Sequence, residues 1–313
     1  MRIPKLNTKD LVTVSDLTRN EIMALFNLTA GLKRDAARGR HPDFLKKKSL
    51  AMIFEKSSTR TRVSFETGVT QLGGHALFLD GNSIQLRRGE TIFDTAKVLS
   101  RYVDGIMIRT FSHDNVVELA KSASVPVING LSDEHHPCQA LADFFTIYER
   151  DRRLKEVTMA YVGDGNNVAH SLIQCAAILG VNIVLACPAQ YEPDPTIVED
   201  ARRVASRSGS KVTITRDPEA AVRDANYIYT DVWISMGEEK KAAAKKRALA
   251  KYRITKELLS KGRPDSKVMH CLPAHRDEEI EADVLDSGRA IVFDEAENRL
   301  HVQKAVMCAL MGK

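Results

Sequence analysis

The feature that most constrains the fold is an alternation of short apolar runs with stretches of helical periodicity, which occurs twice along the 313 residues. In the first half, apolar runs predict buried strands at 50–54, 76–79, 105–108 and 125–128, and helical spacing predicts helices at 91–103 and 115–123. A helix is also expected near the start, because Thr18 and Glu21 have capping-box spacing. Such alternation is typical of βαβ units and a parallel sheet.

The pattern restarts after a charged stretch near residue 150. A helix at 137–150 precedes the restart, strands are predicted at 158–162, 183–186, 212–214, 227–230, 268–270 and 291–293, and a last helix follows. We therefore predict an α/β fold with two domains, each a Rossmann-like parallel β-sheet flanked by helices, and a C-terminal helix that closes the chain. The expected domains are 1–150 and 151–313, with the helix at about 297–312 packing back on the first domain.

Composition limits the classes of function. The net charge of +5 is spread along the chain, which suits a small anionic ligand better than a nucleic acid. Five cysteines with no CxxC pair argue against a disulfide scaffold and a structural zinc site, and indicate a reducing compartment. With no apolar N-terminal segment and no apolar run of about 18 residues, the sequence predicts a cytoplasmic protein with no membrane span.

Residues 57–62, Ser-Ser-Thr-Arg-Thr-Arg, lie between a predicted strand and a predicted helix. Hydroxyl groups, guanidinium groups and the free N–H groups of a first helical turn together favour an anion site. Arg60 and Arg62 are two residues apart and point in different directions on a helix, so we expect only one in that site. The alternative is that Ser58 is only an N-cap and both arginines are solvated. The Walker pattern of nucleotide triphosphatases is absent.

Polar residues follow several other predicted strands, where ligands of open α/β sheets bind. In order along the chain they are Arg109, His136, Gln139, Asn167, Asp231, Ser235, Met236 and Cys271. The first half thus offers basic and proton-bearing groups for an anion, and the second half offers groups for an ammonium-bearing ligand. Gly163-Asp164-Gly165 begins like a dinucleotide fingerprint, but Val168 stands at the third glycine, which argues against NAD. The Lys/Ala-rich residues 238–251 predict either a solvated helix or loop, or a mobile lid.

Taken together, these motifs resemble the carbamoyltransferase family over essentially the whole chain. Residues 58–62, Ser-Thr-Arg-Thr-Arg, resemble its carbamoyl-phosphate loop, and residues 136–139, His-Pro-Cys-Gln, resemble its H-P-x-Q motif. Residues 231–237 and 270–273 resemble the pair of motifs found in ornithine-type members. Aspartate-type members would be expected to carry basic residues there instead.

The resemblance implies transfer of a carbamoyl group from carbamoyl phosphate to the δ-amino group of L-ornithine, giving L-citrulline and phosphate, with no cofactor and no metal. Such a reaction belongs to arginine metabolism, in synthesis or in breakdown. The implied catalytic residues are Arg109, His136, Cys271 and Asp231. The implied carbamoyl-phosphate residues are Ser58, Thr59, Arg60, Thr61, Gln85, Arg109, His136, Gln139, Cys271, Leu272 and Arg299. The implied ornithine residues are Asn167, Asp231, Ser235 and Met236.

Gln85 resembles a residue that reaches the phosphate site of a neighbouring subunit. The resemblance therefore implies a homotrimer, or a multiple of trimers, with shared active sites and with neither nucleic acid nor membrane as a partner. Two alternatives stay open at this point. One is a carbamoyltransferase for another amine such as putrescine, and the other is a non-catalytic anion-binding relative.

Overall fold

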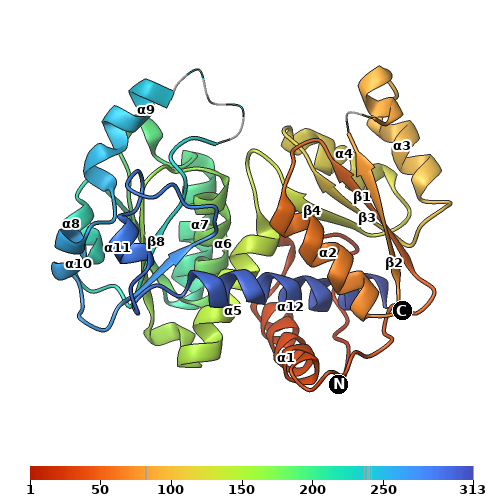
Figure 1. Ribbon diagram of the computed structural model, residues 1–313, viewed down its shortest axis with the longest axis horizontal. Helices are drawn as coiled ribbons and strands as arrows, with labels where there is room; N and C mark the ends of the chain where they lie inside the picture. Colours follow the sequence, from red (N-terminus) through yellow and green to blue (C-terminus); the bar gives the residue numbers. More distant parts are fainter. Residues whose placement is uncertain (82, 236, 238–239, 241, 313) are drawn as a thin grey trace. The chain divides into compact units, whose positions relative to one another are not determined.

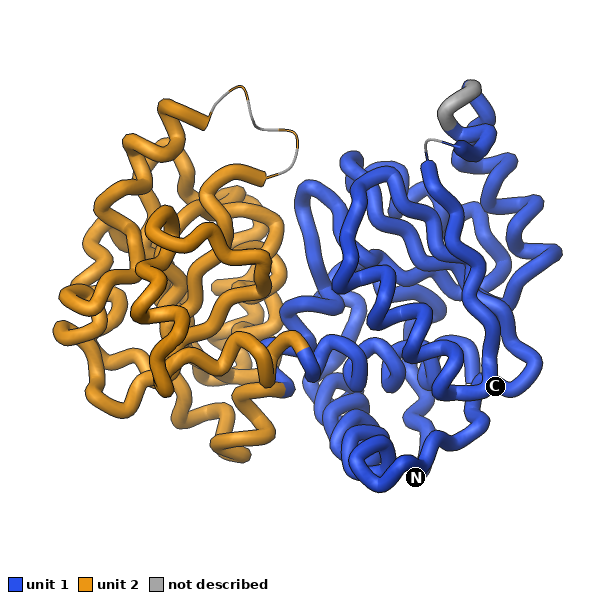
Figure 2. Tube along the Cα trace, in the orientation of Figure 1, with its two compact units in different colours: residues 1–145, 297–313 blue, residues 146–296 orange. Residues whose placement is uncertain are grey.

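The computed structural model describes residues 1–81, 83–235, 237, 240 and 242–312. The chain divides into two compact units (Figure 2). Unit 1 comprises Met1–Phe145 and Glu297–Lys313, and unit 2 comprises Thr146–Ala296. Both unit boundaries fall inside helices, one in α5 (Pro137–Asp151) and the other in α12 (Val292–Met311).

Unit 1 is built on a four-stranded parallel sheet with the order β2-β1-β3-β4 (Figure 1). Its strands are β1 (Ser49–Phe54), β2 (His75–Asp80), β3 (Gly105–Arg109) and β4 (Val127–Leu131). Its helices before α5 are α1 (Arg19–Ala36), α2 (Thr59–Gln71), α3 (Ile92–Leu99) and α4 (His113–Ser122), with short 3-10 helices η1 (Val14–Asp16) and η2 (Gln85–Arg88). The central strands β1 and β3 are buried on both faces, which explains their uninterrupted apolar sequences.

Unit 2 is built on a five-stranded parallel sheet with the order β7-β6-β5-β8-β9. Its strands are β5 (Thr158–Val162), β6 (Asn182–Ala186), β7 (Val212–Thr215), β8 (Tyr227–Thr230) and β9 (Lys267–His270). Its α-helices are α6 (Asn167–Leu179), α7 (Pro195–Ser208), α8 (Pro218–Val222), α9 (Ala242–Leu249), α10 (Lys256–Ser260) and α11 (Ala282–Leu285). Its 3-10 helices are η3 (Leu154–Glu156), η4 (Ala189–Tyr191) and η6 (Ala250–Tyr252).

The strand order reverses at one central strand in each unit. From β1 the chain continues to β2 on one side, while β3 lies on the other, and β5 has the same place between β6 and β8. Crevices that bind ligands form beyond the carboxyl ends of strands at such switch points. The segment after β1 and the turn after β5 are therefore the places where this topology favours binding.

The predicted strands are all observed except the one at 291–293, which was wrong. Val292 is the first residue of α12, and Ala290 makes only an isolated bridge with Val268. Phe293 has 76% of its surface exposed, so the apolar Ile-Val-Phe triplet is not a buried strand. A triplet carries too little periodicity to distinguish a strand from the first turn of a helix.

The opening helix is capped as predicted. The Thr18 side chain accepts a hydrogen bond from the Glu21 backbone N–H, and the Glu21 carboxylate accepts one from the Thr18 N–H. Among the described helices, none has the length and apolar character needed to cross a membrane.

Candidate functional site

The segment after β1 leads into the N-terminus of α2, an arrangement that favours an anion. Ser58 is the N-cap residue, and its Oγ accepts a hydrogen bond of 3.2 Å from the Thr61 N–H. The Ser58 hydroxyl also lies 3.1 Å from Thr61 Oγ1. The helix start at the carboxyl end of the central strand aims free N–H groups and the positive end of the helix dipole at this point.

The two arginines of the loop have different surroundings. Arg62 is exposed, its Nε lies 3.1 Å from Glu66 Oε1, and its guanidinium carbon lies 3.7 Å from the centre of the Phe78 ring. Arg60 is half-buried and lies close enough to His136 to influence its protonation. Arg62 therefore makes the structural contacts expected of one member of the pair, which leaves Arg60 as the candidate anion ligand.

Arg299 of α12 joins the starts of two helices that are far apart in the sequence. Its guanidinium donates to Gln139 Oε1 and, over 3.2 Å, to Thr61 Oγ1, and it is 4% exposed. Gln139 donates from its amide nitrogen to Asp143 Oδ1 over 2.7 Å. These bonds fix the orientation of Gln139 and bring a buried positive charge beside Thr61.

His136 and Arg109 complete a strongly positive cluster in unit 1. His136 precedes Pro137 at the start of α5, and its carbonyl accepts from the N–H groups of Gln139 and Ala140. Arg109 ends β3 at an irregularity of the register with β4, and such irregularities re-aim side chains. Burial, followed by the charges of Arg299, Arg109 and Arg60, holds the pKa of His136 well below its usual value. The imidazole is therefore neutral at neutral pH, and the surrounding charges favour an anion.

Lys56 lies in this unit and was not among the predicted site residues. Lys56 is buried, pairs with Asp133, and places its Nζ 4.3 Å from the centre of the Phe111 ring. Its position directly before residues 57–62 was the sequence signal that could have identified it.

Two other residues stand apart from the cluster. Cys138 is fully buried, and burial raises its thiol pKa to about 12, so it is unreactive packing. Gln85 is exposed at the start of η2 and lines a pocket of about 690 Å³.

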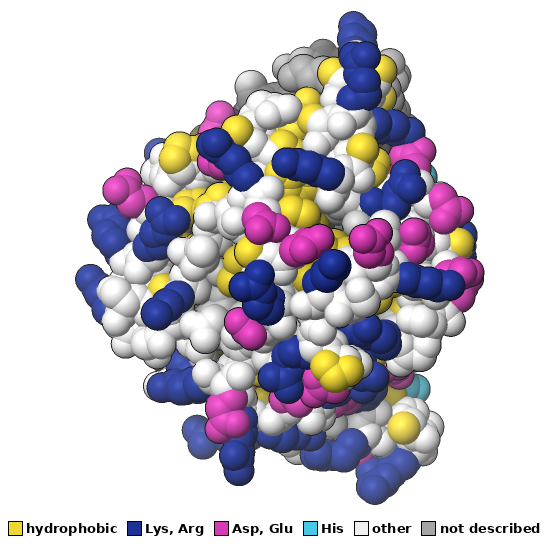
Figure 3. All heavy atoms as spheres, turned by 90° about the vertical axis from the view of Figure 1, so that its left-hand side faces the viewer, with side chains coloured by type: hydrophobic (Ala, Val, Ile, Leu, Met, Phe, Trp, Pro, Cys, Tyr) yellow, Lys and Arg dark blue, Asp and Glu magenta, His cyan; other side chains and the backbone are white. Residues whose placement is uncertain are grey.

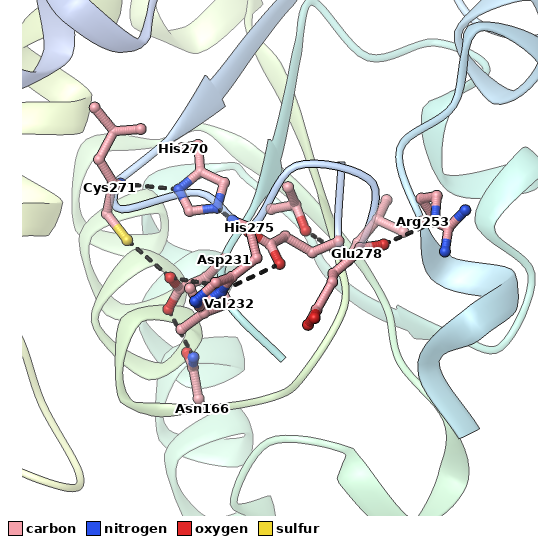
Figure 4. A network of polar contacts seen from close by, with 12 residues as sticks. Asn166, Asp231, Val232, Arg253, His270, Cys271, His275 and Glu278 are labelled. Carbon is pink, nitrogen blue, oxygen red and sulfur yellow. Dashed lines mark hydrogen bonds and ion pairs between the residues drawn. The ribbon is translucent and has the colours of Figure 1, made fainter. Parts of the chain in front are cut away.

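Unit 2 has its own cluster at the carboxyl ends of β8 and β9. The parallel register pairs Thr230 with His270, so the residues that follow them, Asp231 and Cys271, lie next to each other. The Cys271 thiol donates to Asp231 Oδ1 over 2.8 Å, and Asn166 Nδ2 donates to Asp231 Oδ2 over 2.7 Å (Figure 4). Asp231 is 4% exposed. A buried carboxylate held by two donors is a suitable partner for an ammonium group.

The turn after β5 supplies the amide side chains of this cluster. Asn166 is the N-cap of α6, with Oδ1 accepting from the Val168 and Ala169 N–H groups, and it is Asn166 that contacts Asp231. The sequence prediction named its neighbour Asn167, which is the first, half-buried residue of α6. Ser235 is half-buried, and the predicted Met236 lies outside the described residues.

His270 supports the turn that carries Cys271. Its Nδ1 accepts from the Leu272 N–H over 2.8 Å, and its Nε2 is bonded to Glu279 Oε1 over 3.1 Å. Asp231, His270 and Cys271 each offer a metal-ligand atom within 4.8 Å of the others, a donor set that zinc prefers. Because both ring nitrogens of His270 already take part in hydrogen bonds, its imidazole would have to lose one of these hydrogen bonds to coordinate an ion. Two further groups of possible ligands are His113, Glu134 and His135, and His275, Glu278 and Glu279.

Two family models match nearly the whole chain. The carbamoyl-P binding domain of aspartate/ornithine carbamoyltransferase matches residues 9–149, and the Asp/Orn binding domain matches residues 155–310. The chain belongs to the aspartate/ornithine carbamoyltransferase family. The first model covers most of the positive cluster around His136, and the second covers the Asp231 cluster.

Members of the aspartate/ornithine carbamoyltransferase family are similar to this chain in sequence and in structure. The ornithine carbamoyltransferases of Bacillus thuringiensis subsp. konkukian and of Bacillus cereus are 51% identical over 310 residues, which cover 99% of this chain and 96% of theirs. The ornithine carbamoyltransferase structure from Pyrococcus furiosus has a TM-score of 0.96 at 50% identity and covers 99% of both chains. The anabolic ornithine carbamoyltransferase from Campylobacter jejuni has a TM-score of 0.91 at 40% identity and covers 97% of this chain and 99% of its own.

Proposed function

We propose that this chain transfers the carbamoyl group from carbamoyl phosphate to the δ-amino group of L-ornithine, producing L-citrulline and phosphate. The observation that carries the proposal is the buried Asp231 carboxylate, held by Asn166 and Cys271 in the unit matched by the amino-acid-binding family model. A carboxylate at this place suits the α-ammonium group of an amino acid. Basic residues, which would suit a second substrate carboxylate, are absent from the described contacts of Asp231.

The phosphate half of the reaction is assigned to unit 1. Ser58, Thr59, Arg60 and Thr61 bind the phosphate, supported by the N-terminus of α2. Arg299 lies beside Thr61 and Gln139 and adds a buried positive charge. A bound phosphoryl group would offset the charge of the guanidinium groups that surround His136.

The carbonyl oxygen of carbamoyl phosphate is assigned to Thr61, Arg109 and His136. Attack by the amine forms a carbon–nitrogen bond and places negative charge on this oxygen. The carbon–oxygen double bond then forms again as the bond to phosphate breaks, and phosphate leaves with the negative charge. Neutral His136 donates an N–H to the oxygen without giving up its proton, and Arg109 supplies a fixed positive charge. Gln139 accepts from the carbamoyl NH2.

The amino-acid half of the reaction is assigned to unit 2. Asp231 pairs with the α-ammonium, and Asn167, Ser235 and Met236 bind the remaining amino-acid end. The Cys271 sulfur and the Leu272 carbonyl face the δ-amine. That amine has an unperturbed pKa of roughly 10.4, so it must lose a proton before it attacks. Cys271 and Asp231 are the two groups available to assist this loss of a proton, and a hydrogen bond joins them.

We infer a homotrimer, or a multiple of trimers, in the cytoplasm. Gln85 is exposed, and the edge strand β2 next to it in the chain exposes Leu77 and Phe78, as α2 exposes Val63. An open sheet edge with apolar side chains is typically covered by another subunit. All five cysteines are free, which fits a reducing compartment.

The test is citrulline formation by the purified protein with carbamoyl phosphate and, in parallel, L-ornithine, putrescine or L-aspartate. Turnover with L-ornithine alone supports the proposal. Turnover with putrescine would keep the phosphate half and overturn the assignment of Asp231, since putrescine has neither a carboxylate nor an α-ammonium to distinguish. Binding of carbamoyl phosphate without any turnover would instead identify a non-catalytic relative.

A further inference from the structure

Helix α9 holds one of its lysines away from water. The Lys245 side chain is 3% exposed, its Nζ lies 2.7 Å from Asp164 Oδ2, and the Asp164 side chain is 8% exposed. The Tyr191 ring centre lies 5.4 Å from the same Nζ. The next residue, Lys246, is paired with Glu278 over 2.5 Å, but its side chain is 44% exposed. Of the segment 238–251, residues 238, 239 and 241 lie outside the described residues. The solvated-helix prediction fits Lys246 but was wrong for Lys245, which is buried.

Asp164 belongs to the turn that follows the central strand β5, and the backbone of this turn is closely packed. The Gly165 N–H donates to the Tyr191 carbonyl over 2.8 Å, and a Cβ on Gly165 would meet the Pro193 nitrogen at 2.3 Å. The Asp164 carbonyl accepts from Tyr161 Oη over 2.7 Å. The Asp164 side chain, in turn, is paired with Lys245.

The same turn delivers the side chain that orients Asp231. The Asn166 N–H donates to the Asp164 carbonyl over 2.8 Å, and Asn166 Nδ2 donates to Asp231. A continuous series of contacts thus runs from Lys245 through the turn to Asp231 and on to Cys271. Figure 4 shows its last part, with Asn166 and Cys271 on either side of the Asp231 carboxylate.

Stability alone is a weak reason to bury this ion pair. Dehydrating two charges offsets much of their attraction, so apolar side chains of similar volume would often stabilise the fold as well. An ion pair differs from an apolar contact because it fixes one carboxylate oxygen at one point. It also cancels the charge of Asp164, which lies near Asp231: after burial, both carboxylates contribute to raising the pKa of Tyr161 well above its usual value.

We infer that Lys245 is a positioning residue for the amino-acid end of L-ornithine. By holding Asp164, it sets the 163–166 turn so that Asn166 presents its amide to Asp231 in the orientation that receives the α-ammonium. This inference rests on the proposed function. It predicts an effect on ornithine binding with little effect on the carbamoyl-phosphate half.

The test compares Lys245→Met with Lys246→Met, which removes the exposed ion pair one residue along the same helix. We expect Lys245→Met to raise the KM for L-ornithine about tenfold, while kcat and the KM for carbamoyl phosphate change by less than about twofold. Lys246→Met should leave all three constants near wild type. An equal rise in ornithine KM for Lys246→Met, or none for Lys245→Met, would overturn the inference.

A double variant separates positioning from charge balance. Lys245→Met/Asp164→Asn leaves no unpaired buried charge, so its melting temperature should return toward wild type while its ornithine KM stays raised. If its KM also returned to wild type, Lys245 would act only by neutralising Asp164, and the positioning role would be wrong. The same variant carries the test if Lys245→Met alone does not fold. Turnover of L-ornithine by the wild type tests the proposed function, whereas the ratio of variant to wild-type KM tests this inference.

Discussion

At the residue scale, Arg60 and Arg62 show how a spacing of two on a helix separates two like side chains. Arg62 is engaged by Glu66 and by the Phe78 ring, whereas Arg60 contributes to the positive field around His136. We expect Arg60→Ala to lower the affinity for carbamoyl phosphate by about 2–5 kcal/mol, the usual loss when one partner of a desolvated charge pair is removed. Isothermal titration with carbamoyl phosphate measures this loss.

Arg62→Ala is the matched control. Its exposed pair with Glu66 should contribute about 0.3–0.5 kcal/mol to folding and nothing to ligand affinity. Near-normal carbamoyl-phosphate affinity in Arg60→Ala, or a comparable loss in Arg62→Ala, would contradict the assignment of the phosphate loop.

Cys271 is the half-buried cysteine of the chain, and its thiol donates to a buried carboxylate. Cys271→Ser keeps a donor for Asp231 but removes the sulfur, and we expect normal folding with reduced turnover or ornithine affinity. Cys271→Ala also removes the donor. Without this donor the Asp231 carboxylate loses one of the two groups that orient it, so ornithine affinity should fall further than in Cys271→Ser. Steady-state kinetics of both variants provide the measurement, and unchanged constants would reduce Cys271 to a packing role.

At the element scale, helix α12 contains a histidine whose protonation opposes folding. Burial, followed by the charge of Lys304 and, more weakly, that of Lys33, lowers the pKa of His301 to about 4 despite the opposing effect of Glu297. The unfolded chain binds a proton below about pH 6.5, and the folded chain does not until about pH 4. Since the unfolded state binds more protons in this window, stability falls as the pH is lowered through it.

We therefore expect His301→Gln to lose less thermal stability than the wild type between pH 7 and pH 5. Melting temperatures at the two pH values give the comparison, with the exposed His75→Gln as a variant that should behave like the wild type. His136, whose pKa is lowered for a similar reason, is unchanged in both variants, so part of the pH dependence should persist. A melting-temperature drop for His301→Gln equal to that of the wild type would contradict the prediction.

Local sequence patterns predict the bounds of some helices and strands correctly and those of others wrongly. The strands β5 and β8 begin and end at the predicted residues because both are short apolar segments with charged or polar neighbours. The predicted helix at 91–103 ends at Leu99. Residues 292–293 begin a helix instead of lying in a strand, because short apolar stretches fit either period. Register, which places Asp231 beside Cys271, is a property of paired strands that neither segment encodes alone.

At the scale of the whole molecule, the relevant properties are the distribution of surface charge and the assembly of subunits. Figure 3 shows a face on which Lys and Arg are interspersed with Asp and Glu, without the single basic patch typical of nucleic-acid binding.

The proposed assembly into trimers with shared sites can be tested at Gln85. If it completes the phosphate site of a neighbouring subunit, Gln85→Ala and Arg60→Ala will each be impaired alone but will complement each other in mixed oligomers.

Co-expression of the two variants tests this prediction. In randomly mixed trimers, about a quarter of the sites receive Gln85 from one subunit and Arg60 from the next, so about a quarter of the wild-type activity should return. Light scattering on the same samples checks that the oligomers form. Recovery no greater than the sum of the separate variants would place Gln85 outside the shared site.

The sequence by itself determined the two parallel sheets, the helix start after β1 and the family, because periodicity, capping and motifs are local properties. Only the tertiary structure decided which side chains meet. Arg299 reaches Thr61 and Gln139 from the last helix, and Lys245, one of several basic residues in its segment, is the one that is buried. Such contacts depend on strand order, register and helix packing between residues far apart in the sequence, which no local window of the sequence contains.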